Sequence, residues 1–537
     1  MGHELTLPNW LRAIGSGPHG AHRRALRDDS GELTFAELAD AMDAVAVGLL
    51  RSGLRTGDRV VTAMEPSIPH TVVILGALAA GLVAAPLNAR LTGPEARAYL
   101  ATLDPGVVIA DPAHASLAHE TGCRVVELTA AGERKPVADR TAPLGSHSHS
   151  HSQGRGGTLV PPAEDAPAII FATGGTTGTP KGVLHTQRSL WLWLNTCAHG
   201  NPRTPADIEL FFSPFFHITL GTNLLAPLLA GGEVWIQRRF DAGSALAAID
   251  RGAGRLMGAP TMFSALRAHP AFATTRRENV TAIRFGSAPS TDDFVRGLLR
   301  DFPNARIRAG FGATEFGSVM GFDHEDLLAG RFTGVGRPLP GATVRILGED
   351  GCEVPAGVVG DLVVACPWQG HGYYGLPEET AETFRADGVH IGDRASRTED
   401  GWVFIAGRRK EVIISGGENV YPREVEEVIL RHPHVADVVV YGLPDGHWGE
   451  RVEAGIVAVR DRTVGLEELR GFCRADLAGY KIPKKVRLLD AIPLTANNKP
   501  DRRRVRADAL AEATGTGPAG SADMPQGADT PEGADKP

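Results

Sequence analysis

Apolar residues recur at two different spacings in the first 130 residues of the chain. Over residues 34–53 they are separated by steps of three and four, which places them on one face of a helix. Thr34 and Glu37 form a capping-box pattern at the start of this helix. Residues 70–81 predict a second, apolar helix, and shorter runs have the length of buried strands: residues 59–63, 106–110 and 124–128. This alternation of strands and helices predicts a layered α/β fold.

The pattern changes further along the chain. A buried strand is predicted at residues 168–171, and strand-rich patches follow at residues 342–347 and 361–366. From residue 410 the chain predicts a compact α+β unit, with helices at 425–430 and 466–477 and strands at 435–441 and 451–459. From residue 514, glycine, alanine, proline and acidic residues dominate, which is typical of disorder. We predict three parts: an N-terminal domain over 1–409, a C-terminal domain over 410–512 and a disordered tail over 513–537.

Composition narrows the class of protein. With 537 residues the chain is too long for one core, and 42% hydrophobic with 22% charged residues is ordinary for a soluble globular protein. A net charge of −8 argues against a nucleic-acid partner. The five cysteines are scattered, which fits the reducing cytoplasm and argues against disulfides or a zinc site. We find neither a signal peptide nor an apolar run of roughly 18 residues, so we expect a cytoplasmic protein without a membrane span.

A histidine-rich segment interrupts the α/β pattern. Residues 145–157 read GSHSHSHSQGRGG, in which His147, His149 and His151 alternate with serine. A metal-binding tract is one interpretation, and a protein that stores or senses metal is the function it would imply. No acidic or thiol ligand stands beside the histidines, so we favour a solvated low-complexity loop.

The segment FATGGTTGTPKG, residues 171–182, follows a predicted buried strand. Its glycines let backbone amides point into one concave nest, its threonines add hydroxyl donors, and Lys181 adds a positive charge. These features together predict a cradle for phosphate. It is not the usual triphosphatase loop, because Lys181 stands between Pro180 and Gly182 rather than before serine or threonine.

Further motifs extend this pattern. Together with the cradle they resemble those of the adenylate-forming superfamily, which includes acyl- and aryl-CoA ligases, and the resemblance runs from about Trp10 to Arg504 in the family's order. The motifs are PFFH at 214–217, GSAP at 286–289, GFGATE at 310–315, Asp393, SGGENVYP at 415–422 and Lys499. The resemblance implies a large N-terminal domain of layered α/β subdomains with a small β subdomain. A small, mobile α+β C-terminal domain would complete this α/β fold.

The resemblance also implies roles for single residues. Phe311 would stack on adenine, Asp393 and Arg408 would hold the ribose, Thr314 would touch phosphate, and Glu315 would hold Mg²⁺. Lys499 would bridge the carboxylate and the α-phosphate, so the catalytic set is Lys499, Glu315 and Thr314. The implied ATP- and AMP-binding set is Thr173, Gly174, Gly175, Thr176, Thr177, Gly178, Lys181, Ser287, Ala288, Pro289, Phe311, Gly312, Asp393 and Arg408.

Two further groups of residues follow from the resemblance. The acid pocket would be formed by His217, Thr219, Asn223, Gly312 and Ser318. Lys410 would be the hinge of the C-terminal domain, and Gly416 and Gly417 would line the CoA channel. The chain departs from the family pattern at four positions: Gly174 replaces serine, Phe311 tyrosine, Ile391 threonine and Asn498 glycine.

The predicted function is ATP-dependent activation of a carboxylic acid through an acyl-adenylate, followed by transfer to CoA. The cofactors and co-substrates would be ATP, Mg²⁺ and CoA. The polar pocket residues favour a small, polar-substituted aromatic acid over a medium aliphatic one. Alternative acceptors are a carrier-protein thiol or a non-thiol nucleophile, and a non-catalytic nucleotide-binding regulator is a less favoured class. We expect a monomer or a homodimer.

Overall fold

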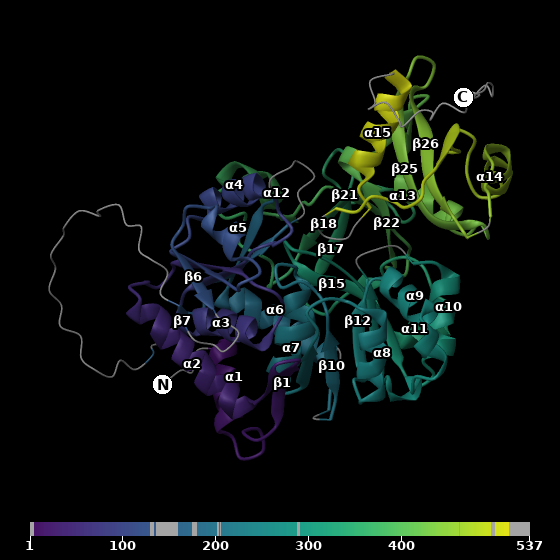
Figure 1. The fold of residues 1–537 in the computed structure, drawn as a ribbon. Helices are drawn as coiled ribbons and strands as arrows, with labels where there is room; N and C mark the ends of the chain where they lie inside the picture. Colours follow the sequence, from purple (N-terminus) through teal and green to yellow (C-terminus); the bar gives the residue numbers. More distant parts are fainter. Residues whose placement is uncertain are drawn as a thin grey trace, which may run out of the picture. The chain divides into compact units, whose positions relative to one another are not determined.

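The computed structural model describes residues 5–128, 134–135, 159, 161–173, 180–200, 203–204, 206–286, 290–460, 462–495 and 500–514 (Figure 1). The chain forms two compact units, one ending at Lys410 and the other beginning at Glu411. We describe each unit by itself. No helix among the described residues is long and apolar enough to cross a membrane.

A seven-stranded sheet, in the order β7-β6-β5-β3-β4-β8-β9, forms one layer of the first unit. Strands β6, β5, β3, β4 and β8 run parallel, whereas β7 and β9 are antiparallel to their neighbours. The strands are β3 Arg59–Ala63, β4 Val83–Pro86, β5 Val107–Ala110, β6 Val125–Leu128, β7 Arg134–Lys135, β8 Pro167–Ala172 and β9 Gly182–Thr186. The strands predicted at 59–63, 106–110, 124–128 and 168–171 are therefore confirmed to within two residues.

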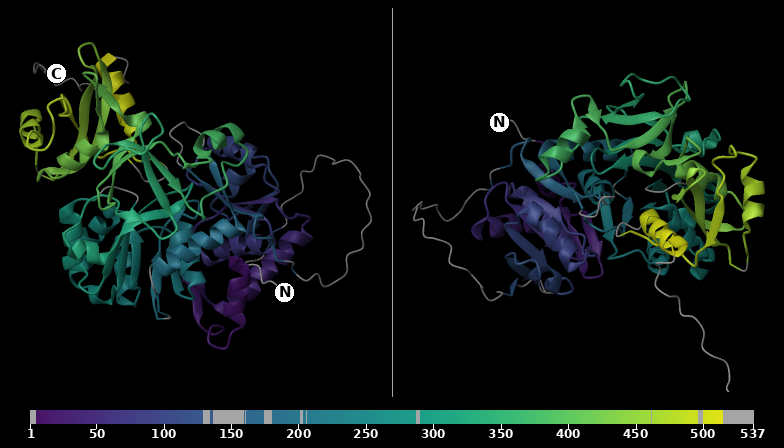
Figure 2. Two further views of the ribbon diagram at one scale, coloured as in Figure 1. Left: turned by 180° about the vertical axis from the view of Figure 1, so that it is seen from behind. Right: turned by 90° about the horizontal axis from the view of Figure 1, so that it is seen from above.

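Helices α2, Phe35–Arg51, and α3, Ile68–Ala79, pack side by side near this sheet (Figures 1 and 2). The predicted capping box begins α2, because the Thr34 hydroxyl accepts from the Glu37 amide and the Glu37 carboxylate accepts from the Thr34 amide. Helix α3 begins two residues earlier than predicted, because Ser67 caps it. The other helices here are α1 Leu7–Ser16, α4 Gly93–Leu103, α5 Ala115–His119 and α6 Gln187–Gly200.

A nine-stranded sheet, in the order β16-β15-β14-β13-β12-β10-β11-β1-β2, forms the second layer. Strands β10 to β14 run parallel, so their carboxyl ends meet at one edge, and β15 returns antiparallel to β14. The strands are β1 Arg24–Asp28, β2 Gly31–Thr34, β10 Ile208–Phe211, β11 Glu233–Ile236, β12 Arg255–Gly258, β13 Ala282–Gly286, β14 Arg306–Ala313, β15 Gly317–Phe322 and β16 Arg337–Pro338. The associated helices are η1 Gly221–Leu225, α7 Ala226–Leu229, α8 Ala242–Asp250, α9 Pro260–Ala268, η2 Pro270–Ala273, η3 Arg277–Asn279, α10 Asp292–Asp301 and α11 His324–Leu328.

A small six-stranded sheet and helix α12, Pro377–Thr383, complete the first unit. Its strands are β17 Thr343–Leu347, β18 Gly360–Ala365, β19 Phe384–Arg385, β20 Gly388–Val389, β21 Asp393–Arg397 and β22 Val403–Arg408. The short helix η4, Arg409–Glu411, follows β22. The strand-rich patches predicted at 342–347 and 361–366 are β17 and β18.

The second unit is a sheet in the order β24-β23-β26-β25, with β27 paired to β26. Residues alternate along β25: Val438 and Val440 join the core that also holds residues of α13 and α14, whereas Val439 and Tyr441 join Val505 of α15. The elements are β23 Ile413–Ser415, β24 Glu418–Val420, α13 Pro422–Ile429, β25 Val435–Asp445, β26 Gly449–Ala458, α14 Leu466–Cys473, β27 Lys485–Leu488 and α15 Arg502–Thr514. Helix α15 therefore reaches two residues into the tail predicted from residue 513.

Candidate functional site

The turn that joins β14 to β15 carries Thr314 and Glu315, two of the predicted catalytic residues. His185 Nε2 lies 3.1 Å from the Thr314 carbonyl oxygen, and the Gly370 amide donates to the Glu315 carbonyl at 2.8 Å. Glu315 is buried. The turn is therefore fixed from two sides, by β9 and by the segment that follows β18.

The Glu315 carboxylate has a partner that the sequence analysis missed. The Tyr373 hydroxyl donates to Glu315 Oε1 at 2.7 Å, and the Tyr373 ring lies 4.8 Å from the Lys181 ammonium nitrogen. Burial, and secondly the Glu315 charge, raises the pKa of Tyr373 above its usual range, so its hydroxyl remains a donor. Tyr373 thus connects the acidic turn to the base of the glycine-rich segment. The pair Tyr373-Tyr374 in GHGYYG was the available signal.

The glycine-rich segment is closed at its base by a hydrogen bond from the Thr173 amide to the Lys181 carbonyl, 2.8 Å long. Strands β8 and β9 pair up to Ala172 and Gly182, so Thr173 and Lys181 stand where this hairpin opens. The predicted cradle residues between them lie outside the described residues: Gly174, Gly175, Thr176, Thr177 and Gly178. The same holds for Ser287, Ala288, Pro289, Lys499, Asn498 and the histidines at 147, 149 and 151.

Asp393 and Arg408, the predicted ribose pair, lie opposite each other on β21 and β22. Arg408 Nε is 3.1 Å from Asp393 Oδ1, with Asp393 buried and Arg408 partly exposed. Phe311 and Gly312 lie at the end of β14, where a bulge shifts the register with β15. A β-carbon on Gly312 would lie 2.2 Å from the Gly317 carbonyl oxygen, so only glycine fits there.

Three predicted pocket residues come from the loop and helix after β10. The Thr219 amide donates to His217 Nδ1 at 3.3 Å, and the Thr219 hydroxyl lies 3.1 Å from the same nitrogen. This arrangement leaves Nε2 as the protonated nitrogen of a neutral His217. Asn223 is buried in η1. Ser318, the fourth, is buried on β15 opposite Gly312.

The sequence analysis missed a charged residue beside Ser318. Arg284, on β13, donates from Nη2 to the Ser318 hydroxyl at 2.8 Å. Its register partner on β12 is Met257, whose sulfur lies 3.9 Å from the Thr222 hydroxyl of η1. An arginine inside an otherwise apolar strand, directly before the GSAP motif, was the signal in the sequence.

Trp193 of α6 packs against three parts of the site. Its indole lies against both Gly221 and Gly317: a β-carbon on either glycine would come within 2.6 Å of the ring. The indole also stacks on His185, with ring centroids 5.7 Å apart, and meets Phe171 edge-on. The tryptophan therefore fixes η1, β15 and His185 relative to one another.

The predicted hinge residue lies in a short helix, and the predicted channel residues form a turn between two strands. Lys410 lies in η4, the last residue of the first unit. Gly416 and Gly417 form the turn between β23 and β24, both with positive φ, and the Gly416 amide donates to the Trp448 carbonyl at 2.8 Å. A left-handed turn of this kind favours glycine at both positions.

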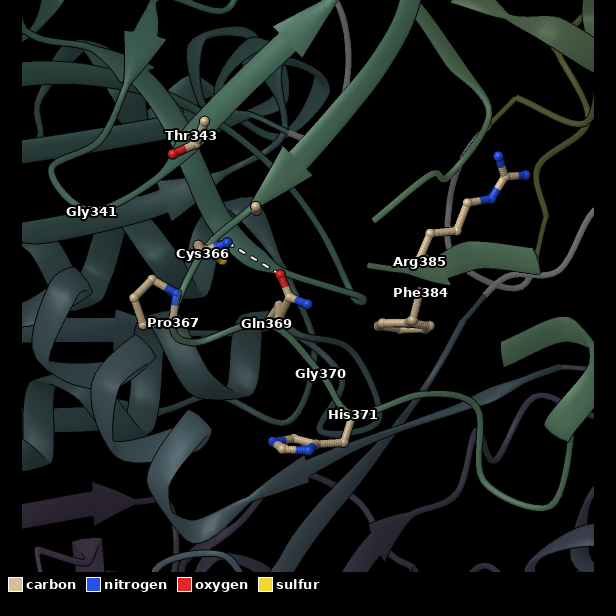
Figure 3. Close-up of a pocket in the computed structure, with 10 residues that line it drawn as sticks. Gly341, Thr343, Cys366, Pro367, Gln369, Gly370, His371, Phe384 and Arg385 are labelled. Carbon is tan, nitrogen blue, oxygen red and sulfur yellow. Dashed lines mark hydrogen bonds between the residues drawn. The ribbon is translucent and has the colours of Figure 1, made fainter. Parts of the chain in front are cut away.

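A hollow of about 610 Å³ lies next to β17 and β18 (Figure 3). In it, the Gln369 side-chain oxygen accepts from the Cys366 amide at 3.2 Å. The lining residues are Gly341, Thr343, Ala365, Cys366, Pro367, Gln369, Gly370, His371, Phe384 and Arg385. None of them was predicted as a site residue. The hollow borders the site through Gly370, whose amide binds the Glu315 carbonyl.

The fold and this group of residues define an adenylate-forming enzyme with a large N-terminal and a small C-terminal domain. Residues 17–374 match the family of AMP-binding enzymes, and residues 424–499 match the C-terminal domain of AMP-binding enzymes. The chain belongs to this family.

Named relatives refine the class. The chain is 34% identical to a feruloyl-CoA synthase of Amycolatopsis sp, covering 93% of this chain and 98% of the relative. It is 33% identical to a sulfoacetate–CoA ligase of Cupriavidus necator, covering 89% and 93% of the two chains. The ATP-bound structure of MatB from Rhodopseudomonas palustris superimposes with a TM-score of 0.81 at 29% identity, covering 94% and 99%. The predicted class, an AMP-forming acid–CoA ligase that uses ATP, is confirmed.

We expect acid to destabilise the fold through two buried histidines. Burial lowers the pKa of His185 and of His70 to about 4, from an ordinary value of 6.5. Between pH 6.5 and 4 the unfolded chain binds protons that the folded chain does not, so stability is complete above pH 6.5 and falls below it. Each histidine should cost about 1 kcal/mol between pH 7.5 and 5.5.

Urea unfolding followed by tryptophan fluorescence at the two pH values measures this loss. His185→Gln keeps a donor for the Thr314 carbonyl and should reduce the pH-dependent loss by about 1 kcal/mol. His22→Gln, which changes an exposed histidine, is the control and should leave the loss as in the unaltered protein. An unchanged pH dependence in His185→Gln would contradict the prediction.

We also expect Tyr373→Phe to weaken ATP use. The substitution keeps the ring below Lys181 and removes the hydroxyl that orients the Glu315 carboxylate. Loss of such an orienting partner typically costs about 10- to 100-fold in metal affinity or activity. Acid-dependent pyrophosphate release, titrated with Mg²⁺ and ATP, measures the change. Tyr374→Phe makes the same chemical change one residue away and should stay near the unaltered rate.

Proposed function

We propose that this enzyme converts a small carboxylic acid with a polar substituent into its CoA thioester at the site around Glu315. The observation that carries the proposal is the closed arrangement of Glu315, Tyr373 and Lys181 at the carboxyl edge of two sheets. One carboxylate and one ammonium there contact the same tyrosine, and Lys181 lies at the base of the glycine-rich segment. Both charges are needed where a phosphate chain and a cation are bound together.

In the first step, an oxygen of the substrate carboxylate attacks the α-phosphorus of ATP. The bond from that phosphorus to the bridging oxygen breaks, and pyrophosphate leaves. Two anions must approach each other, so charge neutralisation is the main task of the protein. Lys181 and Thr173, at the mouth of the hairpin, would bind the departing pyrophosphate, and Lys499 would lie between the reacting carboxylate and phosphate.

Glu315 fits a magnesium site. Mg²⁺ prefers carboxylate oxygens, and a ligand carboxylate is commonly oriented by a hydrogen-bonding neighbour. The Tyr373 hydroxyl supplies that neighbour at Oε1. When bound, the ion would neutralise phosphate charge during the displacement.

In the second step, the CoA thiol attacks the acyl carbonyl and AMP leaves. We assign Lys410 as the hinge and the Gly416-Gly417 turn as part of the pantetheine channel. One cleft would then serve both steps after rotation of the second unit. An acyl carrier protein is the alternative acceptor, since a fatty acid–[acyl-carrier-protein] ligase of Streptomyces coeruleorubidus is 31% identical over 88% of this chain.

The pocket supports a polar acid. Thr219, Asn223 and Ser318 present two hydroxyls and an amide, whereas a lipid tunnel would be lined by aliphatic residues. We keep the preference for a small aromatic acid over a medium aliphatic one. The test incubates the protein with MgATP, hydroxybenzoates or octanoate, with and without CoA, and detects products by mass spectrometry. AMP and an aryl-CoA are expected together, and octanoyl-CoA as the main product would reverse the preference.

Replacing Lys499 should separate the two steps. Lys499→Ala removes the cation between two anions, so acid-dependent pyrophosphate release should fall about 100-fold or more. Thioester formation from a supplied acyl-adenylate should change only a few-fold, because Lys499 has no part in it. Lys485→Ala, an exposed lysine of the C-terminal domain predicted over 410–512, is the matched control for the loss of positive charge. Equal losses in both steps would contradict the assignment of Lys499.

A further inference from the structure

Arg284 is a charged residue in a strand that is otherwise apolar. Its neighbours along β13, Ile283 and Phe285, are buried on the other face in the core that includes Val295 of α10. Arg284 instead lies beside Ser318 of β15 and Cys197 of α6. Its face of the sheet is therefore the one that carries Ser318, a predicted pocket residue.

The guanidinium extends towards the carboxyl edge of the sheet. Arg284 pairs in register with Arg308, yet its Nε and Nη2 lie against Gly310, two residues further along β14. A β-carbon on Gly310 would approach both nitrogens to 3.3 Å. Gly310 thus leaves space for the guanidinium, and Ser318, the register partner of Gly312, receives its hydrogen bond.

The charge of Arg284 lacks a carboxylate partner within the described part of the chain, where Ser318 and Cys197 are its polar neighbours. Arg308 on the adjacent strand, by contrast, has the acidic groups Asp323 and Glu325 near it. Two arginines whose side chains are buried at β10 and β12 of the same sheet are paired with carboxylates: Arg203 with Glu209, and Arg255 with Asp207 at 3.2 Å. Buried charges are normally compensated in this way. A bound anion would complete the pattern at Arg284.

We propose that Arg284 and Ser318 bind a negatively charged substituent of the substrate acid, so that the preferred substrate carries a second carboxylate or a sulfonate. This inference rests on the proposed function and narrows it. The activated carboxylate would face Glu315 and the glycine-rich hairpin, and the second anionic group would reach β13. The Thr222 hydroxyl of η1 lies 3.9 Å from the sulfur of Met257, which is the register partner of Arg284. Helix η1 therefore lies next to this part of the sheet.

ATP is the other anion that could reach an arginine in this enzyme. The charged groups assigned to its phosphates, Glu315 and Lys181, are connected through Tyr373 and not through Arg284. Arg284 also precedes Gly286 by two residues, inside the strand. The position of Arg284 therefore favours binding of the acid over binding of ATP. The KM for ATP, measured after Arg284 is replaced, distinguishes the two.

The experiment compares pairs of acids of nearly the same shape, in which one member has a second carboxylate and the other has a neutral amide in its place. Terephthalate is paired with 4-carbamoylbenzoate, and succinate with succinamate, in the CoA ligase assay with MgATP. For the unaltered protein we expect kcat/KM to be about 100-fold higher for the charged member of at least one pair, because a neutral acid leaves Arg284 without a partner. A preference for the amides in both pairs would overturn the inference.

Variants test the residue itself. Arg284→Met keeps the length of the chain and removes its charge, so kcat/KM for the charged acid should fall about 100-fold, with no fall for the amide and an unchanged KM for ATP. Arg284→Lys should recover part of the loss. Arg308→Met is the matched control and should not change the preference between the two acids. Circular dichroism and thermal melting show whether each variant is folded.

Each outcome has one meaning. If Arg284→Met lowered kcat/KM equally for the acids with a second carboxylate and for their amides, Arg284 would have a structural role and the inference would be overturned. A raised KM for ATP with no change in kcat/KM for the acids would also overturn it. If the protein converted acids without a second anionic group and rejected every acid that has one, the inference would be overturned. The proposed function would then still stand. Absence of acid-dependent AMP with every acid would instead contradict the proposed function.

Discussion

The close approach of backbones at the carboxyl end of β14 is the constraint on which the site depends. Side chains are excluded at three crossings: a β-carbon on Gly286 would lie 2.6 Å from the Gly310 carbonyl oxygen, one on Gly312 2.2 Å from that of Gly317, and one on Gly321 2.7 Å from that of Ala309. This packing brings the end of β13, the turn with Glu315 and the start of β15 together. It also leaves the space into which the Arg284 guanidinium extends.

Among the described residues, two charges at this edge are each held by a hydroxyl and not by an opposite charge. Glu315 accepts from Tyr373, and Arg284 donates to Ser318. A hydrogen bond to a neutral hydroxyl orients a charged group without cancelling its charge, so the charge remains available to a ligand. By contrast, the charges of Glu209 and Arg255, on β10 and β12 of the same sheet, are compensated within the protein by Arg203 and Asp207. The sheet thus contains both structural charges and charges suited to binding.

Much of the fold could be predicted because hydrophobic periodicity is local. Strand β3 was predicted residue for residue, and the Thr34 cap of α2 is as expected. Strand pairing is not local, so nothing in the sequence placed β1, at residue 24, beside β11 at residue 233. The site shows the same division. Glu315 and Asp393 stand in motifs that can be recognised, whereas Tyr373 and Arg284 acquire their meaning only from contacts with residues 58 and 34 positions away.

The contact of Arg284 with Ser318 changes the interpretation of the polar residues predicted for the pocket. Thr219, Asn223 and Ser318 alone suit any hydroxyl or amine on a substrate, and this was the basis of the expected polar-substituted aromatic acid. A guanidinium without a carboxylate among its described neighbours changes the balance, because selectivity arises from what a wrong substrate leaves unpaired as much as from what the right one binds. A neutral acid would cover Arg284 and remove its water without replacing the lost interactions. The same residue that binds an anionic substituent would therefore also disfavour acids that lack one.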